Sequence, residues 1–228
     1  MTDEQPVRDA ATVMLLRDGA SGIEVLLLRR HPGAAFVAGA HVFPGGAIDG
    51  SDASLGDPAR VAAVREAFEE AGVLLAAGPA PAAAARDTER AVLNARDGTF
   101  AEVVARLGVT ADVDALRFVS RWVTPPGDTR RFDTRFFLAA APTDQDPCHD
   151  DTEIVACAWW RPQHALAAAK RGEIQLILPT ARNLKFLDRF ATVADALAAT
   201  DEADADDPVT ETPFGWRVRL ADEVEVAS

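Results

Sequence analysis

Short runs of hydrophobic, often β-branched residues alternate along the chain with segments in which hydrophobic residues recur at helical spacing. Two of the short runs, Ala11–Leu16 and Ile23–Leu28, flank the turn-forming segment Asp18–Gly22, a pattern typical of a β-hairpin. Further strands are predicted, in chain order, at His41–Phe43, Arg117–Val123, Phe132–Ala140, Ile154–Trp160 and Phe214–Leu220.

Helical spacing is clearest at Pro58–Ala76, which we expect to form one helix with a hydrophobic side. The alanine-rich stretch from Pro79 to Leu107 predicts an inserted pair of helices, interrupted at Asp97-Gly98, that covers a cleft. Further helices are predicted at Pro162–Lys170, Pro179–Phe190 and Thr192–Ala199.

Strands and helices interleave without the regular repeat of a parallel βαβ fold. We therefore predict an α/β (α+β) fold in which a mixed sheet is sandwiched between helices. A single domain would cover residues 1–200, with the helical insertion at about 79–112. The acidic stretch Asp201–Asp207 would begin a linker and C-terminal segment, 201–228.

The expected helix at Pro58–Ala76 carries three glutamates close together. At helical spacing Glu66, Glu69 and Glu70 fall within about a third of the circumference. Like charges three and four residues apart repel by a few tenths of a kcal/mol per pair, so helix stability does not explain them. One interpretation is a solvated acidic face. The other is a bound hard cation such as Mg²⁺, which prefers carboxylate oxygens and bridges to phosphates.

The segment Phe43-Pro44-Gly45-Gly46 precedes this helix. Glycines let a backbone approach a phosphate or a metal closely, and a carbonyl there can serve as a ligand. The alternative is that the two glycines simply form a turn.

The segment Arg65-Glu66-Ala67-Phe68-Glu69-Glu70-Ala71-Gly72-Val73 resembles the second half of the Nudix hydrolase signature, G-x5-E-x7-R-E-U-x-E-E-x-G-U, in which U is a bulky apolar residue. The resemblance implies a mixed sheet between helices. It also implies an enzyme that uses Mg²⁺ or Mn²⁺ to hydrolyse the pyrophosphate bond of a nucleoside diphosphate linked to another moiety.

The same resemblance implies roles for individual residues. Arg65 would fix the carboxylates by ion pairing, and Glu66 would be the candidate base. The implied catalytic residues are Arg65, Glu66 and Glu69, and the implied metal ligands are Gly46, Glu66, Glu69, Glu70 and, from a later loop, Glu153.

The first half of the signature is widened in this chain. The signature places thirteen residues between its first Gly and its Arg, whereas Gly46 and Arg65 enclose residues 47–64. Its first Glu therefore corresponds either to Asp52, counted from Gly46, or to Asp57, counted back from Arg65. We favour helix capping for Asp57, because it is followed by a proline. A chemical role for Asp52 stays open.

Upstream residues resemble the element that coenzyme A diphosphatases carry before the signature, L-L-T-x-R-S-x3-R-x3-G-x3-F-P-G-G, although Ala35 replaces its second arginine. The chain is also similar to the organelle-type acyl-CoA diphosphatases of higher eukaryotes, which share the widened signature and the string Arg131-Phe132-Asp133-Thr134. Both resemblances imply that coenzyme A or acyl-CoA is hydrolysed to 3′,5′-ADP and (acyl-)4′-phosphopantetheine. The implied substrate contacts are Arg30, Phe43, Gly45 and Arg131.

Two alternatives stay open. The chain could be a Nudix pyrophosphatase for another nucleotide, such as NADH, ADP-ribose or a nucleoside triphosphate. It could instead be a Nudix-fold regulator that binds a ligand without catalysis. The intact Glu66, Glu69 and Glu70 argue against a loss of catalysis, and the widened signature argues weakly for it.

Composition narrows the range of partners. The 228 residues carry a formal net charge of −13 at pH 7, which argues against non-specific binding to nucleic acid or to an anionic membrane. An anionic nucleotide substrate then needs metal ions or local arginines in its cleft. The two cysteines give neither a disulfide framework nor a metal-site spacing. With no signal-peptide pattern and no apolar run of membrane length, we expect a soluble, cytoplasmic protein, and a homodimer is compatible with the sequence.

Overall fold

The computed structural model describes residues 6–34, 36–200, 210–211 and 217–220. Ala35, the acidic stretch Asp201–Asp207 and residues 214–216 of the expected C-terminal strand lie outside this part of the chain. No helix in the described ranges combines the length and the apolar character needed to cross a membrane.

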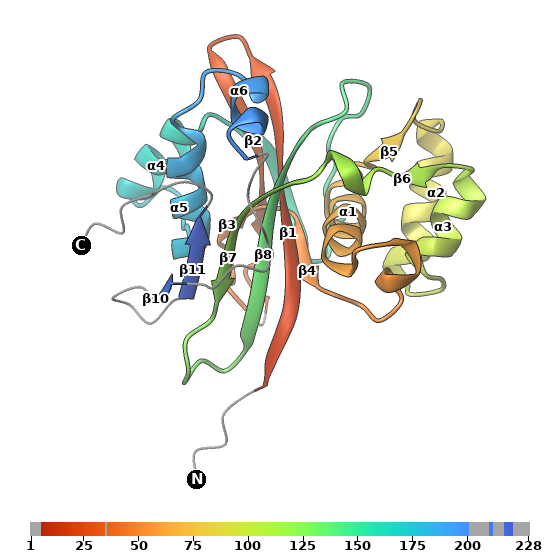
Figure 1. Ribbon diagram of the computed structural model, residues 1–228, viewed down its shortest axis with the longest axis horizontal. Helices are drawn as coiled ribbons and strands as arrows, with labels where there is room; N and C mark the ends of the chain where they lie inside the picture. Colours follow the sequence, from red (N-terminus) through yellow and green to blue (C-terminus); the bar gives the residue numbers. More distant parts are fainter. Residues whose placement is uncertain (1–5, 35, 201–209, 212–216, 221–228) are drawn as a thin grey trace.

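A nine-stranded mixed sheet forms the centre of the molecule (Figure 1). Its strands are β1 (Val7–Gly19), β2 (Gly22–Arg30), β3 (His41–Val42), β4 (Gly45–Ala47), β7 (Arg117–Val123), β8 (Arg131–Ala140), β9 (Ile154–Trp160), β10 (Thr210–Glu211) and β11 (Arg217–Leu220). They follow the order β10-β11-β7-β8-β1-β2-β3, while β4 pairs with β1 and β9 pairs with β2. The long pair β1 and β8 is parallel, and the neighbouring pairs β1–β2 and β7–β8 are antiparallel.

Helices cover both faces of this sheet. The helices are α1 (Pro58–Ala71), α2 (Ala83–Asn94), α3 (Phe100–Leu107), α4 (Pro162–Lys170), α5 (Leu178–Leu187) and α6 (Val193–Ala198). The first three lie on one side of the sheet and the last three on the other (Figure 1). The predicted mixed sheet between helices is therefore confirmed.

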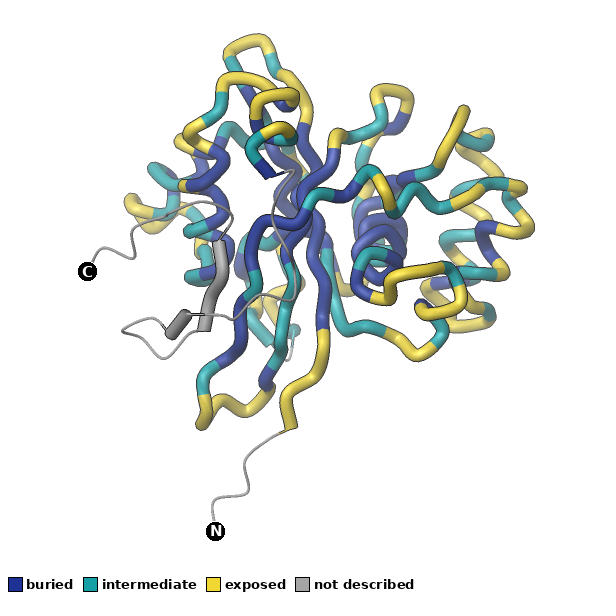
Figure 2. The backbone as a smooth tube through the Cα atoms, viewed as in Figure 1, coloured by how far each residue is buried: buried dark blue, intermediate teal, exposed yellow. Residues whose placement is uncertain are grey.

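The alternation of side chains along β1 divides the hydrophobic core in two. Val13 and Leu15 belong to the cluster that contains Phe68 of α1. Met14 and Leu16 belong to the cluster that contains Leu184 of α5. Figure 2 shows the result, in which the central strands and α1 are the most continuously buried parts of the backbone.

The helix α1 is shorter than predicted, because Gly72 ends it. Gly72 has φ 68°, in the left-handed region that glycine adopts without a Cβ penalty. Its N–H donates to the Phe68 carbonyl over 3.0 Å. The prediction of a helix through Ala76 is therefore wrong beyond Ala71.

Other boundaries differ in smaller ways. The strand β1 extends past both ends of the predicted Ala11–Leu16, and α5 ends before the predicted Phe190. The described part of the C-terminal strand, β11, pairs with both β7 and β10.

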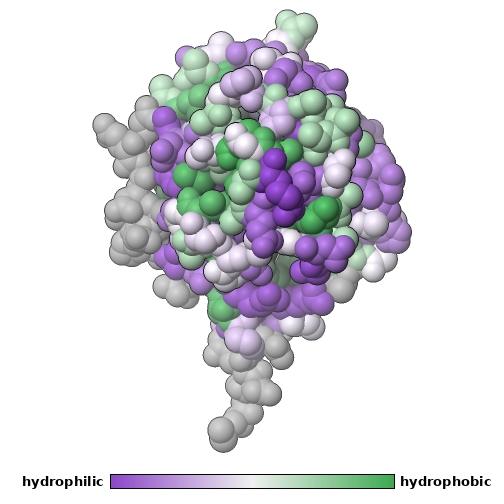
Figure 3. Space-filling model, turned by 90° about the vertical axis from the view of Figure 1, so that its right-hand side faces the viewer, coloured by the Kyte–Doolittle hydropathy of each residue, from purple (hydrophilic) through white to green (hydrophobic). Residues whose placement is uncertain are grey.

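Two short strands, β5 (Ala76–Ala77) and β6 (Thr110–Ala111), pair antiparallel at the base of the helical pair α2–α3. Thr99 and Glu102 form a reciprocal capping box that starts α3, and Phe100 and Val103 pack into the core beneath α1. The face of the molecule that carries these helices is turned toward the viewer in Figure 3, where hydrophilic residues surround small, separate groups of hydrophobic ones.

Candidate active site

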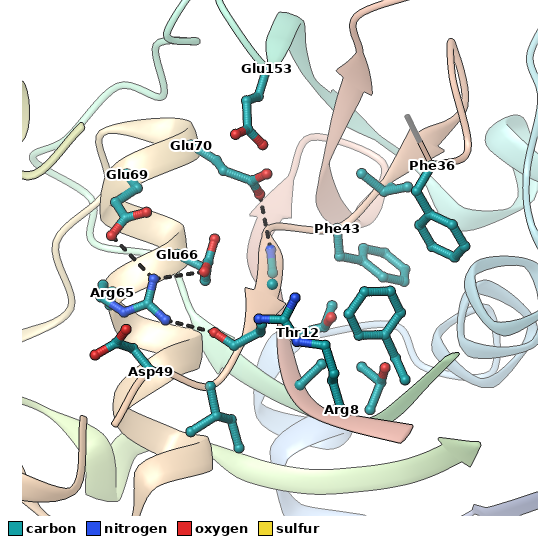
Figure 4. Close-up of a pocket in the computed structure, with 18 of the residues that line it drawn as sticks. Arg8, Thr12, Phe36, Phe43, Asp49, Arg65, Glu66, Glu69, Glu70 and Glu153 are labelled. Atoms are coloured by element: carbon teal, nitrogen blue, oxygen red, sulfur yellow. Dashed lines mark hydrogen bonds and ion pairs between the residues drawn. The ribbon is translucent and has the colours of Figure 1, made fainter. Parts of the chain in front are cut away.

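A cavity of about 640 Å³ lies where α1 and β4 meet one face of β1 and β8, the α2–α3 connection and the start of α5 (Figure 4). Most residues expected at a site line it, namely Arg30, Phe43, Gly45, Gly46, Arg65, Glu66, Glu69, Glu70 and Glu153. Arg131 is not among the lining residues.

The glutamates are held in place by the way α1 begins. The Asp57 carboxylate accepts a hydrogen bond of 2.9 Å from the Arg60 N–H, and Pro58 occupies the first helical turn. This confirms the N-cap that Asp57 followed by proline predicts. From this start, the third and fourth turns of α1 bring Glu66, Glu69 and Glu70 to the cavity wall.

Arg65 is the centre of a buried ion-pair network. Its Nη1 lies 2.7 Å from Glu66 Oε1 and 3.1 Å from Glu69 Oε1. Its Nε donates to Asp52 Oδ1 over 3.0 Å, and its Nη2 donates to the Ala47 carbonyl of β4 over 2.9 Å. Arg65 therefore fixes the orientation of two glutamates and ties α1 to β4.

Asp52 is the buried partner of Arg65 on the side away from the cavity glutamates. It is 1% exposed, accepts from Arg65, and also accepts from the Asp49 N–H over 2.8 Å. Neither Asp52 nor Asp57 lines the cavity. In the structure, Asp57 caps α1 and Asp52 is the buried counter-ion of Arg65.

Burial raises the pKa values of the three glutamates. Desolvation raises the pKa of Glu66 to about 7, with Arg65 opposing the shift and the charge of Glu69 adding to it. Burial likewise raises the pKa of Glu70 well above its ordinary value, and the charge of Glu66 raises it further. The pKa of Glu69 is raised by burial and lowered by Arg65. The low polarity of the surroundings and the repulsion between the carboxylates therefore disfavour simultaneous ionisation of all three glutamates.

The two glycines bring β4 close to α1 and β1. They belong to a strand that pairs with β1, with Gly45 opposite Thr12 and Gly46 opposite Ala11, so the alternative of a simple turn is wrong. A Cβ at Gly46 would lie 2.5 Å from Glu66 Oε1. The Gly45 N–H donates to Glu70 Oε2 over 3.0 Å. A Cβ at Gly45 would lie 2.6 Å from the Ala11 carbonyl oxygen, so the close approach of β4 to β1 requires glycine there.

Glu66, Glu69, Glu70 and Glu153 form one wall of the cavity, which we call the acidic wall, and Arg30 lies beside it. Arg30 Nη1 lies 3.7 Å from Glu70 Oε1, and its Nη2 lies 3.9 Å from Glu153 Oε2. Its Nε is buried and has no hydrogen-bond partner within the described residues. Asp150 accepts from the N–H groups of Glu153 and Ile154, which orders the loop that presents Glu153.

Arg131 was expected at the cavity and lies elsewhere. It is buried, and its Nε donates to the Thr124 carbonyl over 3.2 Å. Strand β8 places alternate residues on opposite faces of the sheet. Phe132, Thr134 and Phe136 line the cavity, so Arg131 points away from it, and its neighbour Arg130 lines the cavity instead.

Sequence reasoning also missed Arg8 and Arg96 as cavity residues. Phe132 shares a face of β8 with Phe136, and Arg130, which directly precedes the strand, continues the same alternation. Arg8 becomes predictable only through the parallel pairing of β1 with β8, where it lies opposite Phe132.

Comparison with known proteins identifies the family. A family model described as the NUDT19 Nudix domain matches residues 56–187. The chain belongs to the NUDT19 Nudix family. The resemblance to the Nudix signature is thereby confirmed, in spite of the widened spacing in its first half.

Relatives in this family cover much of the chain. Human "Acyl-coenzyme A diphosphatase NUDT19" is 32% identical over 77% of this chain and 63% of its own length. The Gallus gallus protein of the same name is 31% identical over 82% of this chain and 70% of its own length. The chain thus spans a little under two thirds of the human relative.

Among solved structures, the NUDIX hydrolase from Alicyclobacillus acidocaldarius is 34% identical and superimposes with a TM-score of 0.78. It covers 85% of this chain, which covers 96% of that structure. The Nudix fold therefore extends over most of the chain, beyond the matched signature region.

The prediction of a cytoplasmic protein is contradicted by the name of a relative. A Caenorhabditis elegans relative, 42% identical over 32% of this chain and 30% of its own length, is named "Peroxisomal coenzyme A diphosphatase ndx-8". The absence of a secretory signal pattern does not separate cytoplasm from other compartments. Relatives of this chain are therefore not confined to the cytoplasm.

Proposed function

We propose that this chain hydrolyses the pyrophosphate bond of coenzyme A or acyl-CoA, and releases 3′,5′-ADP and 4′-phosphopantetheine or its acyl thioester. The observation that carries the proposal is the wall of the cavity, where Glu66, Glu69 and Glu70 stand beside Arg30 and Arg65. Carboxylates that can hold cations and arginines that can bind phosphate oxygens are the two sets of groups that this reaction needs.

The donor set of this wall fits a divalent cation, which Nudix hydrolases generally use. Burial and mutual repulsion raise the pKa values of Glu66 and Glu70, and a bound cation would offset both effects. The described residues contain no ready-made cluster of three acidic, His or Cys ligands, and Arg65 and the Gly45 N–H hold the carboxylate oxygens. Each of these carboxylates has a second oxygen, which would bind a cation while the first oxygen keeps its partner.

We assign Mg²⁺ or Mn²⁺ as the cation, held by Glu66, Glu69, Glu70, Glu153 and the Gly46 carbonyl. When bound, such ions neutralise phosphate charge and lower the pKa of a coordinated water.

The chain's own residues have separate tasks in the proposed reaction. Arg30 lines the cavity beside Glu70 and Glu153, where its guanidinium would bind a phosphate oxygen of the substrate. Arg65 keeps Glu66 and Glu69 oriented toward the cavity. Glu66 is our candidate for the group that accepts the proton of the attacking water, because it lines the cavity beside Glu69 and Glu70.

The substrate assignment is supported by the relatives whose names state an activity on acyl-CoA. It is also supported by the cavity, whose volume of about 640 Å³ suits a ligand of nucleotide size. The half-buried side chain of Phe36, which faces the glutamates across the cavity, offers apolar contact area (Figure 4).

A substrate panel tests the proposal. Coenzyme A, acetyl-CoA, NADH, ADP-ribose and a nucleoside triphosphate are incubated with the chain and Mg²⁺ or Mn²⁺, and kcat/KM is determined by chromatography of the products. We expect the coenzyme A esters to be cleaved best. A tenfold preference for NADH or ADP-ribose would overturn the substrate assignment, and tight binding without turnover of any compound would favour a non-catalytic regulator.

A further inference from the structure

Besides the glutamates, basic and aromatic residues line the cavity. We propose that Arg8, Arg130, Phe36 and Phe132 form a subsite for the nucleobase and the ribose-bound 3′-phosphate of a nucleotide. The inference rests on the proposed function and assigns the two ends of the cavity to different parts of the substrate, with the pyrophosphate at the glutamates and the nucleoside at this subsite.

Strand register assembles one wall of the subsite. Arg8 of β1 lies opposite Phe132 of β8 in the parallel ladder. Side chains at every second position share a face of the sheet. The next pair on that face, Ala10 opposite Thr134, also lines the cavity. Arg8 and Phe132 are therefore the outermost pair of a continuous floor.

Two aromatic rings meet above this floor. Phe36, from the connection between β2 and β3, contacts Phe132 with ring centroids 5.4 Å apart and ring planes at 58°. Both residues are half-buried and line the cavity. Aromatic faces at a cavity wall are suited to stacking on a base, whatever its identity.

Two arginines near these rings have no ion-pair partner among the described residues. Arg8 and Arg130 are exposed and line the cavity. Within the described part of the chain, neither guanidinium makes a hydrogen bond or an ion pair. In a chain of net charge −13, two uncompensated cations beside an aromatic pair favour a ligand that combines a ring with an anion.

This combination discriminates between the two halves of the proposed substrate. Pantetheine and an acyl chain carry no charge, so they would leave both guanidinium groups without a partner. The adenosine half of coenzyme A carries a 3′-phosphate, and arginine binds phosphate through paired hydrogen bonds. The basic end therefore fits the adenosine half.

Product binding tests the subsite without relying on turnover. Calorimetry compares 3′,5′-ADP with 5′-AMP, which lacks only the 3′-phosphate, for the full chain in Mg²⁺. We expect the wild type to bind 3′,5′-ADP at least tenfold more tightly, and the double variant Arg8→Ala, Arg130→Ala to bind the two within twofold of each other. Equal binding by the wild type, or an unchanged preference in the double variant, would overturn the proposal.

Two further variants separate charge from stacking. Arg171→Ala removes the charge of an exposed arginine that pairs with Glu173 and does not line the cavity, so the preference should stay as in the wild type. Phe36→Leu should weaken both nucleotides by a similar factor and leave their ratio unchanged. A ratio that falls equally in Arg171→Ala and in the double variant would show a general charge effect and overturn the subsite.

The subsite and the proposed function fail in different ways. If the wild type prefers 3′,5′-ADP over AMP but cleaves no coenzyme A ester, the activity is wrong and the subsite stands. If the wild type cleaves coenzyme A and 3′-dephospho-CoA with equal kcat/KM and shows no preference between the two products, the subsite is wrong and the activity stands.

Discussion

At the scale of single residues, Arg65 connects the acidic wall to the rest of the fold. It reaches Glu66 and Glu69 at the cavity, Asp52 beneath it and the Ala47 carbonyl of β4. A buried guanidinium with carboxylates on both sides can hold glutamates in place that would otherwise repel one another.

The first prediction concerns the buried half of this network. Asp52→Asn keeps the size of the side chain and removes its charge from beside the buried Arg65. Because Arg65 keeps Glu66 and Glu69 as partners, we expect a loss of about 1–3 kcal/mol in the free energy of unfolding. Urea unfolding measures it, with Asp87→Asn, at an exposed position on α2, as the control. Equal stability of the two variants would contradict the structural role of Asp52.

The second prediction concerns pH and the metal-free protein. Burial raises the pKa of Glu66 from 4.5 to about 7, so between these pH values the folded chain binds more protons than the unfolded chain. Stability should therefore be highest below the unfolded pKa and should fall as pH rises toward about 7.

Thermal unfolding in EDTA at a series of pH values checks this. The Tm of the wild type should fall between about pH 5 and pH 7, and Glu66→Gln, which cannot titrate, should flatten the curve. Identical slopes for the two proteins would contradict the raised pKa of Glu66.

The positions of individual site residues were predictable where they depend only on spacing along the sequence. The shared face of Glu66, Glu69 and Glu70 and the cap at Asp57 follow from helical periodicity and from one proline. The role of Asp52 was not predictable, because its partner Arg65 lies on another element. The place of Arg131 away from the cavity was not predictable either, since a string of residues does not show which face of a strand each one occupies.

At the scale of elements, the α2–α3 connection brings a strained residue to the cavity. Arg96 has φ 60°, an uncommon value for a residue with a Cβ, and it lines the cavity. Its positive charge opposes, in small part, the rise in the pKa of Glu69 that burial causes. Strain of this kind persists where the surrounding structure imposes it, and it often marks a functional position.

The third prediction separates the strain at Arg96 from its charge. Arg96→Gly should be more stable than Arg96→Ala by about 1 kcal/mol, because glycine accepts a positive φ without a Cβ penalty. Both variants should lose activity to a similar extent, since both lack the guanidinium. Urea unfolding and kcat/KM for coenzyme A are the two measurements. An alanine variant as stable as the glycine variant would show that the backbone there is unstrained.

Elements with strong local signals were predictable, and others were not. The hairpin β1–β2 follows from its central glycine-containing turn, and the regular strands and helices follow from periodicity. The strand β4 was missed because two glycines in succession indicate a turn. What holds them in a strand is their close packing against β1 and Glu66, which no local pattern reveals.

At the scale of the whole molecule, the site depends on contacts between distant parts of the chain. β1 pairs with β8 in parallel over ten residue pairs, from Val7 opposite Arg131 to Leu16 opposite Ala140. This pairing brings Arg8 beside Phe132, while β4 brings the glycines beside α1. Fold class was predictable from the interleaved elements, but this strand order was not, because local sequence does not specify the partners of a strand.

We propose that Glu66, Glu69, Glu70 and Glu153 hold the cations with which the chain cleaves a pyrophosphate bond. The most direct measurement is product analysis of coenzyme A hydrolysis against Mg²⁺ or Mn²⁺ concentration, for the wild type and for Glu69→Gln, Glu70→Gln. We predict that 3′,5′-ADP and 4′-phosphopantetheine appear in equal amounts, that EDTA abolishes the reaction, and that the double variant is slower by a hundredfold or more. Cleavage that persists in EDTA, or a double variant with wild-type turnover, would contradict the account.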